Sequence, residues 1–222
     1  MVLLDISCSG TYIGSMSKLE YPADYVDKII CGDCLEVMKG IPDGVIDAVI
    51  TDPPYPREFE YLYEAMAKES KRILRIGGSL LTLCGHSQLP RVLTDIGKHL
   101  KYRWIIQYDQ PGSYARLSMG ILATWKPLLW FVNDRLTPRR CITDKAYSQK
   151  REKNNHPWEQ SSGYAEYGVT NLTDTGQVIL DPFIGSGTTA VVCKNMNRHF
   201  VGIEIDPEYC KIAEDRLRQG VL

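Results

Sequence analysis

Short apolar runs rich in Val, Ile and Leu recur along the chain and alternate with longer stretches in which apolar positions follow helical spacing. Strands that are apolar throughout are typical of a parallel sheet that is covered by helices on both faces. The runs that predict strands are residues 26–31, 45–51, 79–84, 104–108, 128–132, 178–180 and 200–205. The pattern therefore predicts a doubly wound α/β fold, which binds its ligands beyond the carboxyl ends of the strands.

Two stretches predict helices most clearly. Residues 59–74 place three apolar side chains on one face, namely Leu62, Met66 and Ile73. Near the C-terminus, Asp206 is a good N-cap and Pro207 fits a first helical turn. The apolar stripe that follows consists of Tyr209, Ile212, Ala213 and Leu217. Three tryptophans lie in or near predicted strands and are expected in the core: Trp104, Trp125 and Trp130.

Composition narrows the class of protein. The length of 222 residues suits a single domain, and 44% hydrophobic with 24% charged residues is ordinary for a globular chain. No run approaches the roughly 18 apolar residues that a membrane helix needs. Seven cysteines, several of them inside apolar runs, predict no disulfide framework and a reducing cytoplasm. A net charge of -1 argues against a protein that coats nucleic acid by bulk charge.

One segment departs from the apolar pattern. Residues 133–153 are polar and hold seven basic residues against three acidic ones, a local excess of four positive charges. A solvated loop is one interpretation of such a composition, and a contact surface for an anionic partner is the other.

A glycine-rich turn follows the run at 178–180. Gly185, Gly187 and Ala190 match the fingerprint of a turn that lets the backbone approach a nucleotide cofactor, and Glu204 ends the next predicted strand, where a carboxylate holds ribose hydroxyls. Asp181 lies just before the turn, and its carboxylate would repel a pyrophosphate but attract an ammonium group. A cofactor with an amino-acid head, such as S-adenosylmethionine, therefore fits better than NAD.

A second motif, Asp52-Pro53-Pro54-Tyr55, follows the run at 45–51. The two prolines stiffen the chain and remove two backbone donors. The Asp52 carboxylate and the Pro53 carbonyl remain as acceptors for an exocyclic amine, and Tyr55 offers a face on which a planar base can stack. A rigid turn with a capping Asp is the alternative interpretation.

Taken together, these motifs resemble those of the beta class of DNA amino-methyltransferases. The resemblance rests on the tetrad, on residues 181–189, on Gly202-Ile203-Glu204 and on their order, with the tetrad before the glycine turn. It implies a Rossmann-like class I methyltransferase fold, a mostly parallel doubly wound sheet with a small basic insertion, over residues 1–222 as one domain. S-adenosylmethionine is the implied cofactor, and no metal is expected.

The resemblance also implies roles for single residues. The catalytic group is Asp52, Pro53, Pro54 and Tyr55. Cofactor binding falls to Asp33 and Cys34 at the adenine, Asp181 at the methionine amino group, Phe183 as a wall, the turn residues Gly185, Ser186, Gly187 and Thr188, and Glu204 at the ribose. Where the family usually has Lys-Pro, this chain has Gln160-Ser161, and these two residues are candidates for contacting the methionine carboxylate.

The implied reaction is direct displacement on a base that has been flipped out of DNA. Hydrogen bonds from the amine to Asp52 and to the Pro53 carbonyl would aim the amine at the methyl carbon. In the family, Asp at the first tetrad position favours N6 of adenine over N4 of cytosine. The alternatives are an N4-cytosine enzyme and, more distantly, an NAD-dependent oxidoreductase or a noncatalytic DNA-binding protein.

DNA is the expected partner, and the basic segment lies where the beta class carries its target-recognition insertion. We expect a short recognition insertion over residues 133–155, with DNA contacts from Arg139, Arg140, Lys145, Lys150 and Arg151. Because the insertion is short, either the target is a few base pairs or a second subunit completes the site in a homodimer. The resemblance also suggests a place in restriction-modification.

Overall fold

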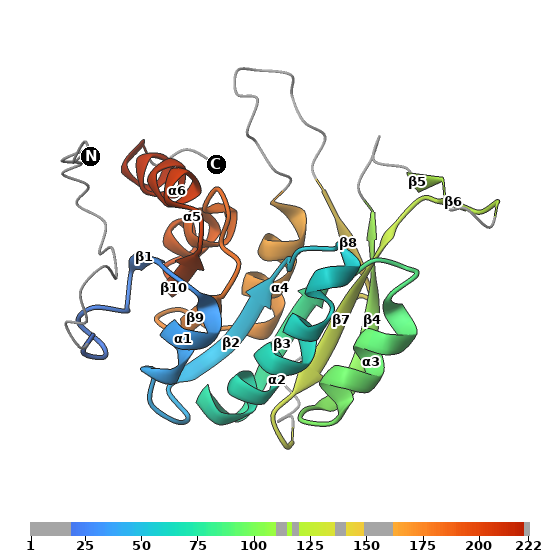
Figure 1. Cartoon of the computed structure of the whole chain (residues 1–222), viewed down its shortest axis with the longest axis horizontal. Helices are drawn as coiled ribbons and strands as arrows, with labels where there is room; N and C mark the ends of the chain where they lie inside the picture. Colours follow the sequence, from blue (N-terminus) through green and yellow to red (C-terminus); the bar gives the residue numbers. More distant parts are fainter. Residues whose placement is uncertain (1–18, 110–114, 117–119, 136–140, 149–161, 220–222) are drawn as a thin grey trace, which may run out of the picture.

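One eight-stranded sheet organises the chain in the computed structural model, which describes residues 19–109, 115–116, 120–135, 141–148 and 162–219. The strand order is β1-β10-β9-β2-β3-β7-β4-β8 (Figure 1). The bounds of these strands are β1 Lys28–Cys31, β2 Ile46–Thr51, β3 Leu74–Leu83, β4 Lys101–Asp109, β7 Lys126–Val132, β8 Lys145–Tyr147, β9 Val178–Asp181 and β10 His199–Glu204. A separate two-stranded ribbon pairs β5 (Ala115–Arg116) with β6 (Leu122–Ala123).

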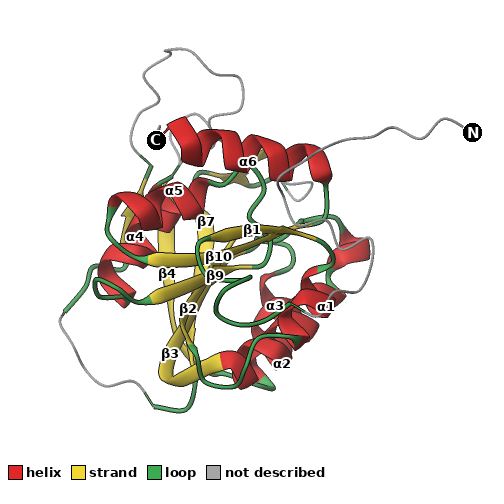
Figure 2. Cartoon of the chain, turned by 90° about the vertical axis from the view of Figure 1, so that its left-hand side faces the viewer, coloured by secondary structure: helices red, strands yellow, loops and turns green. Residues whose placement is uncertain are grey.

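Helices cover both faces of this sheet, as Figure 2 shows. Side chains of α1, α2 and α3 join one buried apolar cluster, and side chains of α4, α5 and α6 join the other. Alternate residues of β2 point to opposite clusters, with Val49 in the first and Ile50 in the second. The helices are α1 Cys34–Lys39, α2 Tyr61–Ile73, α3 Leu89–Gly97, α4 Gly163–Leu172, α5 Thr188–Asn195 and α6 Pro207–Gln219, with a 3₁₀ turn, η1, at Arg57–Phe59. The predicted doubly wound α/β fold is confirmed.

The sheet is parallel except at β7, which runs antiparallel to both β3 and β4. This reversal brings the first residues of β7 to the edge where the parallel strands end. The short strand β8 pairs in parallel with the end of β4, so part of the polar segment extends the sheet. The segment also begins inside the protein, because the buried Asn133 side chain donates to the Leu74 carbonyl at 2.7 Å and accepts from Lys71 at 2.6 Å.

The tryptophans divide between core and surface. Trp130 is buried as expected, and its indole nitrogen donates to Ser79 Oγ at 3.1 Å. The prediction for Trp104 is wrong, because this side chain is 52% exposed. It lies in β4, whose first four residues are all exposed, so a place in a strand does not by itself put this side chain in the core. Within the described residues, no helix combines the length and the apolar character that crossing a membrane requires.

Candidate active site

The motifs meet at the switch point of the sheet, where the order in which the chain adds strands reverses. From β9 the chain continues outward to β10, whereas from β2 it continues outward to β3, so the switch point lies between β9 and β2. A hydrogen bond of 2.6 Å from Thr51 Oγ1 to Asp181 Oδ1 joins the ends of these two strands. Sheets of this kind bind ligands at the carboxyl ends of the strands beside the switch point.

A cavity of about 460 Å³ opens beside this point, a size in the range of small-molecule sites. It is walled by residues from the ends of β1, β2, β9 and β10 and from α2, α4 and α6. The sequence-predicted residues that line it are Asp33, Cys34, Asp52, Pro54, Phe183, Gly185 and Glu204. The structure thus brings residues of the tetrad and predicted cofactor residues from both halves of the chain to one cavity.

Asp181 lies behind this wall and is not among the lining residues. Its side chain is 1% exposed, Oδ1 accepts from Thr51 and from the Phe183 backbone N–H at 3.1 Å, and Oδ2 is buried without a hydrogen bond among the described residues. Burial raises the pKa of Asp181 to about 6, against the opposing effect of the Thr189 and Thr51 hydroxyls. A buried carboxylate with an open acceptor atom is the kind of group that an ammonium ligand would complete.

Backbone amides hold the two other carboxylates. Glu204 Oε2 accepts from the Gly185 N–H at 3.0 Å, and Oε1 accepts from the Asp206 N–H at 2.9 Å. Asp33 caps the first turn of α1, since Oδ1 accepts from the N–H groups of Leu35 and Glu36. Each of the two side chains is therefore fixed by the protein while it lines the cavity.

The glycine turn serves packing as well as ligand access. Gly187 has a φ of +88°, and a Cβ atom there would lie 2.9 Å from Cβ of Ala213 on α6. The buried hydroxyls of Ser186 and Thr188 face Arg216, whose Nη1 lies 2.9 Å and 3.3 Å from them. Ser186, Gly187 and Thr188 do not line the cavity, and contacts with Arg216 of α6 explain the positions of the Ser186 and Thr188 side chains.

The tetrad presents a partly buried acid next to an aromatic ring. The Tyr55 hydroxyl donates to Asp52 Oδ1. Burial raises the pKa of Asp52, whereas this hydrogen bond and the positive charge of Lys126 lower it. Gln88, which lies between β3 and α3, donates from Nε2 to the Tyr55 carbonyl oxygen. This bond anchors the loop that carries Tyr55.

Sequence reasoning missed several aromatic residues of the cavity. Tyr164, from α4, is 6% exposed and lies with its hydroxyl 3.4 Å from Thr189 Oγ1. Burial raises its pKa well above the usual value, and Asp181 and Asp52 add to this effect. Tyr61 and Tyr209 line the mouth with side chains that remain partly exposed. The spacing of buried positions 164, 165, 169 and 172 is the signal that would have predicted α4.

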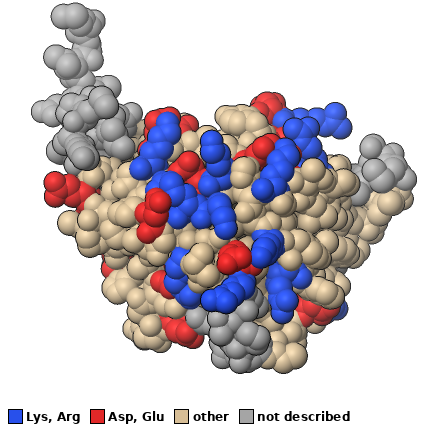
Figure 3. Space-filling model, turned by 90° about the horizontal axis from the view of Figure 1, so that it is seen from below, with Lys and Arg blue, Asp and Glu red and all other residues tan. Residues whose placement is uncertain are grey.

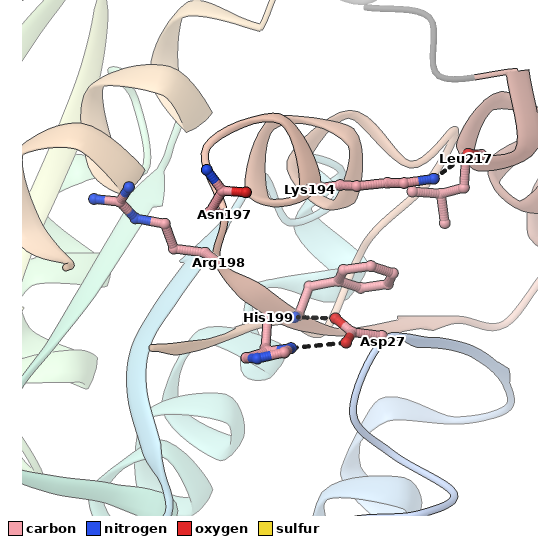
Figure 4. Close-up of a pocket in the computed structure, with 7 residues that line it drawn as sticks. Asp27, Lys194, Asn197, Arg198, His199 and Leu217 are labelled. Carbon is pink, nitrogen blue, oxygen red and sulfur yellow. Dashed lines mark hydrogen bonds and ion pairs between the residues drawn. The ribbon is translucent and has the colours of Figure 1, made fainter. Parts of the chain in front are cut away.

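A second cavity, of about 530 Å³, lies at the start of β10, at the opposite edge of the sheet (Figure 4). The charged side chains that line it are bound to the protein itself. His199 Nδ1 pairs with Asp27 at 2.7 Å, Lys194 donates to the Leu217 carbonyl at 2.9 Å, and Arg198 donates to the Thr173 carbonyl at 2.8 Å. This cavity therefore offers no comparable set of groups for a ligand.

Some of the remaining predicted residues lie in the part of the chain that the structure describes, and the others lie outside it. Pro53 is buried at the end of β2, and Lys145 lies in β8, 3.8 Å from Asp109 and above the ring of Tyr147. Arg139, Arg140, Lys150, Arg151, Gln160 and Ser161 lie outside the described residues.

The switch point and the cavity beside it are those of an α/β protein that binds a small-molecule ligand at the carboxyl ends of its strands. A family model described as DNA methylase, covering the N6 and N4 methyltransferases, matches residues 46–215. The chain belongs to this family of DNA amino-methyltransferases. Membership of this family excludes the alternative of an NAD-dependent oxidoreductase.

Individual relatives agree in fold but differ in target base. DNA adenine methyltransferase YhdJ of Escherichia coli (strain K12) is 26% identical and aligns over 95% of this chain and 86% of its own. The crystal structure of the M1.HpyAVI–SAM complex is 26% identical, with a TM-score of 0.69 over 85% of this chain and 98% of that one. The PvuII DNA methyltransferase, cytosine-N4-specific, has a TM-score of 0.73 at 18% identity over 85% of each chain, which shows the shared fold alone.

Proposed function

We propose that this protein transfers the methyl group of S-adenosylmethionine to N6 of adenine in DNA. The observation that carries the proposal is the meeting of two sites at one cavity, with Asp52 from β2 beside Asp33 and Glu204 from β1 and β10. S-adenosylmethionine is the cofactor, and when bound it supplies an electrophilic methyl group on a sulfonium that leaves readily. The residues of this chain position the two reactants.

The cofactor site is assigned by chemistry. Glu204 is proposed to accept hydrogen bonds from the ribose hydroxyls and Asp33 from the adenine amine. The adenine ring is enclosed by Cys34 and Phe183, both of which line the cavity. Asp181 is proposed to offer Oδ2, which has no hydrogen bond among the described residues, to the methionine ammonium group. Gly185, the residue of the glycine turn that lines the cavity, approaches the cofactor through its backbone.

The amine is proposed to be bound by the tetrad. Asp52 and the carbonyl of Pro53 accept hydrogen bonds from its two N–H groups, and Tyr55 stacks on the base. Tyr55 donates to Asp52 in the structure, and the incoming amine is proposed to replace this phenol as the donor. Adenine is favoured over cytosine by Asp at the first tetrad position and by the adenine-specific relative YhdJ.

DNA contacts are assigned to the recognition insertion, residues 133–155, within a single catalytic domain. Lys145 projects from β8 at the carboxyl edge of the sheet, the edge that also carries Asp52. Arg139, Arg140, Lys150 and Arg151 are proposed to add contacts to phosphates. A homodimer would let a second chain extend this short surface.

Expression in a methylation-free bacterial host tests the reaction and the base together. Modification-sensitive sequencing of the host DNA should detect N6-methyladenine at a recurring short sequence. N4-methylcytosine at such a sequence would overturn the choice of base, and unmodified DNA from cells that contain folded protein would overturn the function.

The catalytic assignment is tested by Asp52→Ala. We expect methyl transfer to fall below detection, because the amine loses its acceptor, while calorimetry finds the affinity for S-adenosylhomocysteine within a few-fold of wild type. Glu204→Ala is the matched variant, and it should weaken S-adenosylhomocysteine binding. Near-normal turnover of Asp52→Ala would refute the assignment.

A further inference from the structure

Lys126 reaches the tetrad from a strand to which the sequence assigned no chemistry. It is the first residue of β7 and pairs with Tyr108 near the end of β4. Because β7 runs against its neighbours, this first residue lies at the carboxyl edge of the sheet. The residues before and after it are held in place. The carbonyl of Pro127 accepts from the Cys84 N–H at 3.2 Å, and the Trp125 ring packs edge-on against the His86 ring with centroids 4.8 Å apart.

The ammonium group of Lys126 lies over the ring on which the base is proposed to stack. Its Nζ atom is 5.1 Å from the centroid of the Tyr55 ring, within the range of a cation–π contact. Its charge also acts on Asp52, whose pKa it lowers. No carboxylate of the described residues forms an ion pair with Lys126, which distinguishes it from Lys39, Lys98 and Lys101.

Of the two partners in this contact, the lysine is the one that can move. Gln88 holds the Tyr55 carbonyl oxygen, so the position of the ring is fixed from the main chain. The lysine side chain is a flexible stem of four carbons. A planar base that stacks on Tyr55 competes with the ammonium group for the ring, and it arrives joined to a backbone phosphate.

We propose that Lys126 covers the Tyr55 ring until a base enters and binds the phosphate of the flipped nucleotide when the base takes its place. This inference rests on the proposed function. An ammonium group that leaves an aromatic ring needs another anionic or polar partner, and the phosphodiester enters with the base. Lys126 would thus connect entry of the base with binding of the DNA backbone.

The test compares Lys126→Met, which keeps the stem and removes the charge, with Lys126→Arg, which keeps a cation. The control is Lys101→Met, because Lys101 pairs with Val132, six residues along β7 and about 20 Å away at the other edge of the sheet. Methyl incorporation into unmethylated genomic DNA is measured as kcat/KM against salt concentration. S-adenosylhomocysteine affinity is measured by calorimetry.

For Lys126→Met we expect a KM for DNA several-fold higher at low salt and a salt slope smaller by about 0.9, the value for one lost phosphate contact. S-adenosylhomocysteine affinity should stay within twofold, Lys126→Arg should restore the slope, and Lys101→Met should match wild type. A slope parallel to that of wild type, or a loss of cofactor affinity, would overturn the inference. If wild-type protein itself transfers no methyl group to DNA, it is the proposed function that fails.

Discussion

At the scale of single residues, Asp181 has the most unusual environment in the site. Its carboxyl group is buried at the switch point, and its pKa is raised to about 6 by burial, with a smaller contribution from Asp52. An unfolded Asp releases its proton near pH 4. Between about pH 4 and 6 the folded chain therefore keeps a proton that the unfolded chain has lost, and the contribution of this group to stability falls as the pH rises through that window.

The same pKa predicts a pH-dependent affinity for the cofactor, because an ammonium ligand favours the ionised carboxylate. S-adenosylhomocysteine should bind roughly tenfold more weakly at pH 5 than at pH 7, since one pH unit below the pKa leaves about a tenth of the groups ionised. Calorimetry over this range measures the effect. Methylthioadenosine shares the adenine and ribose but lacks the amino-acid head, so its affinity should change little.

Asp181→Asn provides the matched variant for this measurement. It keeps the size of the side chain but does not titrate, and it should bind S-adenosylhomocysteine weakly at every pH. Parallel pH profiles for S-adenosylhomocysteine and methylthioadenosine on the wild-type protein would contradict the role of Asp181 at the amino group.

The motifs predicted which acids gather at the cavity, but not how each is held. The backbone donors to Glu204 come from Gly185 and Asp206, whose positions depend on the folded turn. Tyr164 was missed because it comes from a helix on one face of the sheet and carries no motif of its own. Lys126 was missed because its place depends on the direction of β7, which an apolar run does not encode.

At the scale of elements, the glycine turn and α6 form one packing unit. A Cβ atom at Gly187 would meet both Cβ and Cα of Ala213, at 2.9 Å and 3.0 Å, and the φ of +88° disfavours any other residue. At Gly185 the φ is +53°, but a Cβ atom would meet nothing within 4 Å. A side chain would therefore meet backbone strain at both glycines, but a steric clash only at Gly187.

Gly187→Ala should lower the free energy of unfolding by about 3 kcal/mol, because left-handed strain of about 1 kcal/mol adds to an overpacking cost of about 2 kcal/mol. Gly185→Ala should cost only about 1 kcal/mol, the strain alone. Urea denaturation of the two variants without cofactor measures the difference. Equal losses would show that α6 shifts away from the turn at little cost.

The strands were the most predictable elements. Each of the seven apolar runs coincides with an observed strand, although β3 begins at Leu74, five residues before the predicted run. β8 could not be predicted, because Ala146 is the one buried side chain among its three residues. A strand that short at the edge of a sheet is set by its backbone pairing with β4 and leaves almost no apolar pattern.

At the scale of the whole molecule, several described basic residues are paired with acidic ones near the amino edge of the sheet. The view from below in Figure 3 shows Lys and Arg mixed with Asp and Glu on one face. Four basic residues near the amino edge of the sheet lie within 3 Å of a carboxylate, namely Lys39 of Glu36, Arg72 of Asp43, Arg75 of Asp47 and Lys101 of Asp134. Such pairs leave little net charge to attract DNA, so the near-neutral total is compatible with a local basic surface near the active site.

The ion pairs at the amino edge and the proposed recognition insertion together predict which charge reversals change DNA binding. Reversal of Arg139 and Arg140 to Glu should flatten the dependence of kcat/KM on salt, because each phosphate contact contributes about 0.9 to the slope. Lys39→Glu changes charge at the paired edge, where Lys39 contacts Glu36 at 2.7 Å, and should leave the slope unchanged. The measurement is methyl incorporation into unmethylated genomic DNA over a range of salt concentrations. A slope that responds to Lys39→Glu and not to the arginines would place the DNA on the opposite edge of the sheet, where neither Asp52 nor Lys126 could reach a flipped base.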